Sequence, residues 1–293
     1  LELKNPVIAA SGTFGYGLEY ADMVDIARLG GICVKGISLE PRRGNPPPRI
    51  CETPSGMLNS IGLANIGYAR FVNDTLPALR ELGVTVIVNT YGTTLDEFAE
   101  LARRFDRQEG VAALEVNISC PNVKAGGMHF GVAPGPAAEV TRAVREQTSL
   151  PVIVKLSPEA SSIVEVAQAA REAGADALSL INTIRGMCID VETRKPRLGG
   201  VYGGLSGPAI RPLAVRMVHE VHKVVDAPLI GLGGITCLRD ALEFFLAGAS
   251  AIQIGTANYT DPTTAIRVID ELQAYCDERG IVPGDLVGQV VTG

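Results

Sequence analysis

The stretch PVIVKLSPEASSIVEVAQAAREAGADALSLINT, residues 151–183, decides the fold because it holds one complete strand–helix–strand unit. Its two ends, PVIVKLS (151–157) and ALSLINT (177–183), are short apolar runs of the kind found in buried strands. Between them, SIVEVAQAAREA (162–173) has the apolar spacing of an amphipathic helix. A strand that returns through a helix pairs in parallel with the next strand by a right-handed crossover.

The same unit recurs along the whole chain. Further strand-like runs are VIAAS (7–11), GICVKG (31–36), TVIVNT (85–90), LEVNISC (114–120), APLIGLGG (227–234) and SAIQIGT (250–256). Further helix candidates cover residues 20–29, 70–82, 95–105, 137–147, 208–225, 239–247 and 263–279. Eight strands separated by helices predict the α/β class and a (β/α)8 TIM barrel, with residues 1–293 as a single domain.

Two connections are too long and too rich in Pro and Gly for plain linkers. They cover residues 36–65, with PRRGNPPPR, and residues 184–207, with TRKPRLGGVYGGLSG. We expect inserted loops or small hairpins over the C-terminal mouth of the barrel.

Composition excludes several kinds of partner. The net charge is −6, and no run of Lys or Arg is longer than the Arg42-Arg43 pair, so we expect neither nucleic-acid nor membrane binding. The six cysteines form no C-x-x-C pair, which argues against a metal site or an iron–sulfur cluster on this chain. We expect a cytoplasmic protein with a small-molecule substrate. Because the sequence begins at Leu1 without a methionine, we also expect a few residues to precede it.

Polar residues gather at the carboxyl ends of the strands, where barrel enzymes carry their active sites. Two glycine-rich ends, Gly233-Gly234 and Gly255-Thr256, close the last two strands, where barrels commonly bind phosphate, and Gly207 offers another backbone amide. No G-x-G-x-x-G lies between a strand and a helix, so a mononucleotide is favoured over a dinucleotide. The other strand ends carry Ser11, Gly12, Lys35, Asn89, Asn117, Asn122, Lys155, Asn182 and Thr183.

Three kinds of side chain at this mouth point to chemistry. Lys155 ends a buried strand, where it could form a Schiff base, accompany an electron-rich ring, or extend to the rim. Cys120 precedes a proline at a strand end, and it could act as a base, as a nucleophile with His129, or only pack. Amides could hold the edges of a flat ligand with carbonyl and N–H groups, and they are Asn59, Asn117, Asn122 and Asn182.

Several motifs follow one another in order over essentially the whole chain. They are NPVIAASGTFG, VKGISLEPRRGNPPPR, LNSIGLAN, N-x-S-C-P-N at 117–122, IVKLSP, INT, GGLSGPAI, GLGGI and IGTAN. Together these motifs resemble those of class 1 dihydroorotate dehydrogenases. NVKAGGMHFG and NTIRGMCIDVETRKPRLGG are most similar to the class 1B catalytic subunit. Class 2 enzymes carry serine where Cys120 stands.

This resemblance implies a role for each candidate residue. Cys120 would be the base that removes the C5 proton of dihydroorotate while the C6 hydride passes to FMN. Lys35 and Lys155 would lie beside the flavin. The substrate would be held by Asn59, Asn117, Asn122, Asn182, Thr183 and Lys35. FMN would be held by Ala10, Ser11, Gly12, Lys35, Asn89, Asn117, Lys155, Gly207, Gly233, Gly234, Gly255 and Thr256. Residues 123–134, with Gly126-Gly127 as a hinge, are the predicted lid.

The resemblance also implies a partner. Electrons would pass to NAD through a second subunit that carries FAD and a [2Fe–2S] cluster, in a heterotetramer built on a homodimer of barrel subunits. The alternatives are a class 1A enzyme that reduces fumarate and another FMN barrel that reduces dihydropyrimidines or dihydrouridine in tRNA. Two chemically different alternatives are a Schiff-base aldolase that uses Lys155 and a flavin-binding scaffold without activity.

Overall fold

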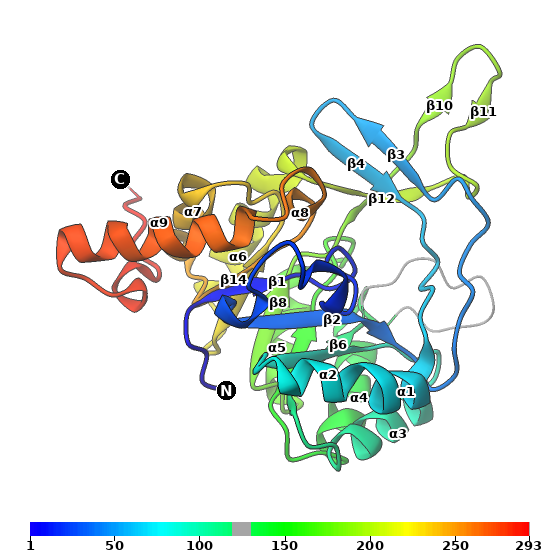
Figure 1. The fold of residues 1–293 in the computed structure, drawn as a ribbon, viewed down its shortest axis with the longest axis horizontal. Helices are drawn as coiled ribbons and strands as arrows, with labels where there is room; N and C mark the ends of the chain where they lie inside the picture. The colour runs from blue at the N-terminus through cyan, green and yellow to red at the C-terminus, as the bar shows by residue number, and fades with distance from the viewer. Residues whose placement is uncertain (119–129, 293) are drawn as a thin grey trace.

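Eight parallel strands form a closed barrel in the computed structural model, which describes residues 1–118 and 130–292 (Figure 1). Around the barrel the strand order is β1-β14-β13-β8-β7-β6-β5-β2, so sequential strands are mostly neighbours. The predicted (β/α)8 barrel is therefore confirmed, with all eight predicted strands present. Their bounds are β1 Val7–Ala9, β2 Gly31–Ile37, β5 Val86–Thr90, β6 Val111–Asn117, β7 Val152–Lys155, β8 Ala177–Leu180, β13 Leu229–Leu232 and β14 Ala251–Ile254.

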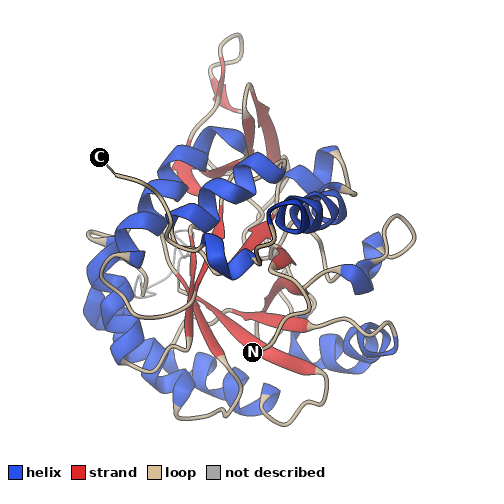
Figure 2. Ribbon diagram, turned by 90° about the vertical axis from the view of Figure 1, so that its left-hand side faces the viewer, coloured by secondary structure: helices blue, strands red, loops and turns tan. Residues whose placement is uncertain are grey.

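Helices surround the barrel and bury their apolar stripes against the outside of the strands (Figure 2). Thr94 and Ser162 cap the helices α3 and α5 with their hydroxyl groups, as expected of N-cap residues. The larger helices are α3 Leu95–Phe105, α4 Pro134–Arg145, α5 Ile163–Glu172, α6 Arg211–His222, α7 Leu238–Ala247 and α9 Thr264–Arg279, and the short α8 covers Ala257–Thr260. None of the helices in the described ranges is both long and apolar enough to cross a membrane.

The predicted helix over residues 20–29 is wrong. The chain there forms two short 3-10 turns, Leu18–Tyr20 and Ile26–Arg28. Asp25 interrupts the helical path because its ψ of 90° lies outside the helical range and its side chain accepts a hydrogen bond from Ala27 N, which caps the second turn.

The predicted helix over residues 70–82 is confirmed but is not uniform. It consists of α1 Gly67–Arg70, a π-helical turn at Phe71–Thr75 and α2 Leu76–Glu81. Pro77 has no N–H to donate to the preceding turn, and this accounts for the interruption of the regular helical pattern there.

The two long connections form small antiparallel sheets above the C-terminal mouth, as predicted. A four-stranded sheet has the order β3-β4-β12-β9, and the hairpin β10–β11 projects beyond it (Figure 1). Asn59 pairs with Gly204 across β4 and β12. The bounds are β3 Ile50–Thr53, β4 Gly56–Asn59, β9 Ile184–Gly186, β10 Ile189–Asp190, β11 Lys195–Pro196 and β12 Gly203–Ser206.

The barrel interior is layered because side chains alternate along each strand with a period of two. One layer is apolar and fills the lower part of the barrel with Ile8, Cys33, Ile87, Ala113, Ile153, Ile230 and Ala251. Two residues further along the same strands, the next layer is mainly polar and holds Lys35, Asn89, Glu115, Lys155 and Gln253, with Ser179 two residues after Ala177. The apolar layer thus closes the barrel from below, and the polar layer faces the mouth.

Candidate active site

Two adjoining cavities occupy the C-terminal mouth of the barrel, with volumes of about 720 and 270 Å³. Every predicted site residue that the structure describes lines at least one of them. These residues are Ala10, Ser11, Gly12, Lys35, Asn59, Asn89, Asn117, Lys155, Asn182, Thr183, Gly207, Gly233, Gly234, Gly255 and Thr256. Cys120 and Asn122 lie outside the described residues, as do His129 and residues 123–129 of the predicted lid.

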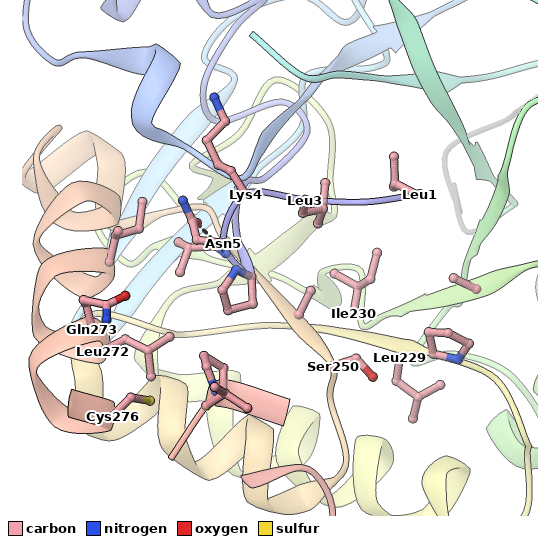
Figure 3. Close-up of a pocket in the computed structure, with 18 of the residues that line it drawn as sticks. Leu1, Leu3, Lys4, Asn5, Leu229, Ile230, Ser250, Leu272, Gln273 and Cys276 are labelled. Atoms are coloured by element: carbon pink, nitrogen blue, oxygen red, sulfur yellow. Dashed lines mark hydrogen bonds between the residues drawn. The ribbon is translucent and has the colours of Figure 1, made fainter. Parts of the chain in front are cut away.

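A third cavity of about 560 Å³ lies at the opposite end of the barrel, where the strands begin (Figure 3). Leu3, Ile230 and Leu272 contribute to its mostly aliphatic wall, and none of the predicted site residues in the described part of the chain lines it. Because barrel enzymes place their chemistry at the C-terminal ends of the strands, the mouth is the candidate active site.

The floor of the mouth centres on Glu115, a fully buried carboxylate on β6. Its Oε1 accepts hydrogen bonds from Asn89 Nδ2 at 2.7 Å and from Cys33 Sγ at 3.1 Å. Its Oε2 accepts from Gln253 Nε2 at 2.7 Å and from Ser179 Oγ at 2.9 Å. Side chains from the four strands β2, β5, β8 and β14 therefore all donate hydrogen bonds to this one carboxylate.

Lys155 completes this arrangement from β7. Its Nζ lies 3.5 Å from Glu115 Oε1, and both side chains are buried, with 6% and 0% of their surface exposed. Burial alone would raise the pKa of Glu115, but the charge of Lys155 and the hydrogen bonds from Cys33, Gln253 and Asn89 outweigh it and lower that pKa. Burial, with Glu115 beside it, raises the pKa of the Cys33 thiol well above its ordinary value. Glu115 is thus an ionised carboxylate and Cys33 a neutral donor.

Sequence reasoning missed Glu115, Gln253 and Ser179. These residues lie within their strands and not at the carboxyl ends, where the site residues were predicted. The available signal was the period of two, since Glu115 stands midway between Ala113 and Asn117 and so shares their side of the strand.

Two amide oxygens of the floor have no hydrogen-bond partner among the described residues. They are Asn89 Oδ1 and Gln253 Oε1, both buried. A Cβ placed on Gly36, which lines the smaller cavity, would lie 2.9 Å from Asn89 Oδ1, so the glycine leaves room for this oxygen. Unpaired buried acceptors are costly, and they indicate a site for a ligand with N–H groups.

The walls supply further polar groups. Asn182 Oδ1 accepts a hydrogen bond from Thr183 N at 2.7 Å, and Asn59 Nδ2 donates to Gly204 O at 3.2 Å. Lys35 lies on β2, and burial lowers the pKa of its ammonium group. The polar groups of these residues could orient a polar ligand of the size of a substrate.

Glycines shape the other end of the larger cavity. Gly207, Gly233 and Gly234 have φ angles of 97°, 134° and 80°, in the region that disfavours other residues. Thr256 Oγ1 donates to Ser206 Oγ at 2.8 Å beside them. All three glycines line the larger cavity, and Gly233 and Gly234 follow β13, in the region where other barrels bind phosphate.

Comparison with known proteins agrees with the sequence resemblance. Residues 1–276 match the family model described as dihydroorotate dehydrogenase. A protein of Geotalea uraniireducens is 54% identical over 293 residues, which is 100% of this chain and 96% of that protein. A protein of Desulforudis audaxviator is 58% identical over 281 residues, 96% of this chain and 92% of that protein. Both are named dihydroorotate dehydrogenase B (NAD(+)), catalytic subunit, which favours the class 1B branch over class 1A. The chain belongs to the dihydroorotate dehydrogenase family.

Proposed function

We propose that this protein oxidises dihydroorotate to orotate in de novo pyrimidine biosynthesis, as the FMN-dependent catalytic subunit of an NAD-linked, class 1B enzyme. The observation that carries the proposal is the mouth itself, where Lys155 and two amide oxygens without a partner among the described residues form a buried floor and glycines form the other end. Residues 1–293 would form one FMN-binding domain.

The residues of the mouth fit FMN. Backbone groups of Gly207, Gly233, Gly234, Gly255 and Thr256 would hold its phosphate. A Cβ on Gly234 would lie 2.7 Å from Gly207 O, so neither loop has space to spare for a side chain. At the other end, the floor and Lys35 offer both donors and acceptors for the polar edge of a flavin ring, and Ala10, Ser11 and Gly12 close the side between them. When bound, FMN supplies the acceptor for the C6 hydride of the substrate.

The residues of the chain orient the substrate and move one proton. Asn59, Asn117, Asn122, Asn182 and Thr183 would bind the carboxylate and ring edges of dihydroorotate. Cys120 Sγ would take the C5 proton. A free thiol has a pKa near 8.5, so the fraction of Cys120 present as the basic thiolate would rise as the pH approaches that value. The ammonium groups of Lys35 and Lys155 would offset negative charge that develops at the polar edge of the ring.

Substitution of Cys120 tests the proposed base. The Cys120→Ala variant should lose turnover while the protein still binds FMN and stays yellow. Cys120→Ser should turn over slowly, with a rate that rises with pH, because a hydroxyl is a weaker acid than a thiol. Normal turnover by Cys120→Ala would refute this assignment.

Electron transfer to NAD would need a partner subunit with FAD and a [2Fe–2S] cluster, in a heterotetramer built on a dimer of this chain. Two observations support this: the relatives are named catalytic subunits, and no group of three His, Cys, Asp or Glu side chains in residues 1–118 and 130–292 could hold a metal ion. We place the complex in the cytoplasm. Purification from the native host should recover both subunits, whereas recovery of this chain alone with full NAD-linked activity would refute the partner.

A further inference from the structure

Glu115 lines neither cavity of the mouth, although it is the centre of the polar floor. Three of the groups that contact it, those of Asn89, Lys155 and Gln253, do line a cavity. Glu115 therefore does not contact a ligand in these cavities directly, and its hydrogen bonds and ion pair reach the cavities through these three side chains.

The carboxylate decides how the two amides are turned. An ionised carboxylate only accepts hydrogen bonds, whereas an amide side chain has one donating and one accepting end. Asn89 and Gln253 both direct their NH2 groups to Glu115, each at 2.7 Å. Their oxygens must then face away from it, and those oxygens are the two that lack a partner in the described part of the chain.

We infer that Glu115 is a positioning residue that fixes the floor as two amide oxygens and one ammonium group toward the polar edge of the flavin. The inference rests on the proposed function, because FMN is the ligand that would form hydrogen bonds with these donors and acceptors. The pyrimidine ring of a flavin has an N–H donor between two carbonyl oxygens, and it needs both acceptors and donors opposite it. The single N–H needs an acceptor opposite it, so inverting the amide that faces it would present a donor where an acceptor is needed.

Glu115→Gln distinguishes this role from simple stabilisation of the barrel. The glutamine side chain at position 115 should keep its amide oxygen on the side of Lys155, because the ammonium group of Lys155 repels the NH2 group of the amide. Its NH2 group then faces Gln253 and Ser179, so Gln253 must invert and present its own NH2 group to the cavity. We expect the dissociation constant for FMN, measured by quenching of FMN fluorescence, to rise at least about tenfold.

The exchanged pair Glu115→Gln/Gln253→Glu provides the rescue. Its carboxylate at position 253 accepts from the amide at position 115 and still presents an oxygen to the cavity. We expect FMN binding within about threefold of wild type, since the acceptor pattern is restored. Asp106→Asn is the matched control: Asp106 accepts hydrogen bonds from Thr148 Oγ1, Ser149 N and Ser149 Oγ but lines neither cavity, so FMN binding should not change.

Unchanged FMN binding by Glu115→Gln would overturn the inference, and so would a loss that the exchanged pair does not restore. If Glu115→Gln does not fold, the exchanged pair decides alone: binding near wild type supports the inference, and binding weakened about tenfold overturns it. Failure of the wild-type protein to bind FMN would instead overturn the proposed function, and the inference with it.

Discussion

Replacing Lys155 by methionine should leave a buried carboxylate without its counterion. Lys155 Nζ and Glu115 Oε1 are 3.5 Å apart, and the exposed fractions of the two side chains are 6% and 0%. Methionine keeps most of the apolar stem of lysine and removes the charge, so the change in stability reports mainly on the ion pair.

The size of the effect follows from this distance. Two unit charges 3.5 Å apart attract by about 5 kcal/mol at an effective dielectric constant of about 20. Removing one partner of a buried pair typically costs about 3–5 kcal/mol. Because four hydrogen bonds to Glu115 remain, we expect the lower end, a loss of about 3–4 kcal/mol in the free energy of unfolding at pH 7.

The stability deficit of Lys155→Met should depend on pH, and the direction of this dependence follows from the pKa of Glu115. In the wild type the pKa of Glu115 is lowered, so its stabilising contribution is present above the unfolded pKa and is lost as the pH falls through the folded pKa. Without Lys155, burial becomes dominant and raises the pKa of Glu115. A raised carboxyl pKa makes the variant less stable as the pH rises, so its deficit should narrow when the pH falls from about 7 to about 5.

Urea unfolding of the FMN-free proteins, followed by circular dichroism at both pH values, measures this deficit. Lys35→Met is the matched control, since Lys35 forms no ion pair with a described residue and should lose less than about 1 kcal/mol. A Lys155→Met deficit below about 1 kcal/mol, or one that widens toward pH 5, would refute the electrostatic account of the floor.

Two glycines at the mouth give further tests, with Gly284→Ala as their control because its Cβ would enter open space. Gly207→Ala should lower the free energy of unfolding by about 2–3 kcal/mol, since its φ of 97° disfavours alanine and the Cβ would lie 2.6 Å from Gly56 Cα; a thermal melt equal to that of the control would contradict this. Gly36→Ala should weaken FMN binding about tenfold by displacing Asn89 Oδ1, which lies 2.9 Å from the added Cβ, and an unchanged fluorescence titration would count against it.

Much of the barrel could be predicted from the sequence because each unit combines a short apolar strand with a helix of regular spacing. The strand ends also identified the residues that line the mouth, since parallel strands bring their carboxyl ends together. The prediction of a helix over residues 20–29 was wrong because a side-chain cap at Asp25 competes with helical hydrogen bonds. The spacing of apolar residues carries no information about caps of this kind.

The polar floor could not be predicted in the same way. Glu115 is surrounded by apolar neighbours in its strand, and its partners come from positions 33, 89, 155, 179 and 253, far apart in the sequence. Only the closure of the barrel brings these five strands around one carboxylate. Residue periodicity places each side chain inside the barrel, but it does not say which of them hydrogen-bond.

Anaerobic addition of dihydroorotate to the purified, FMN-loaded protein tests the central claim most directly. If the mouth binds FMN and dihydroorotate as proposed, one equivalent of substrate should bleach the visible flavin absorbance and yield orotate. A protein that binds FMN and keeps its colour with excess dihydroorotate would contradict the account.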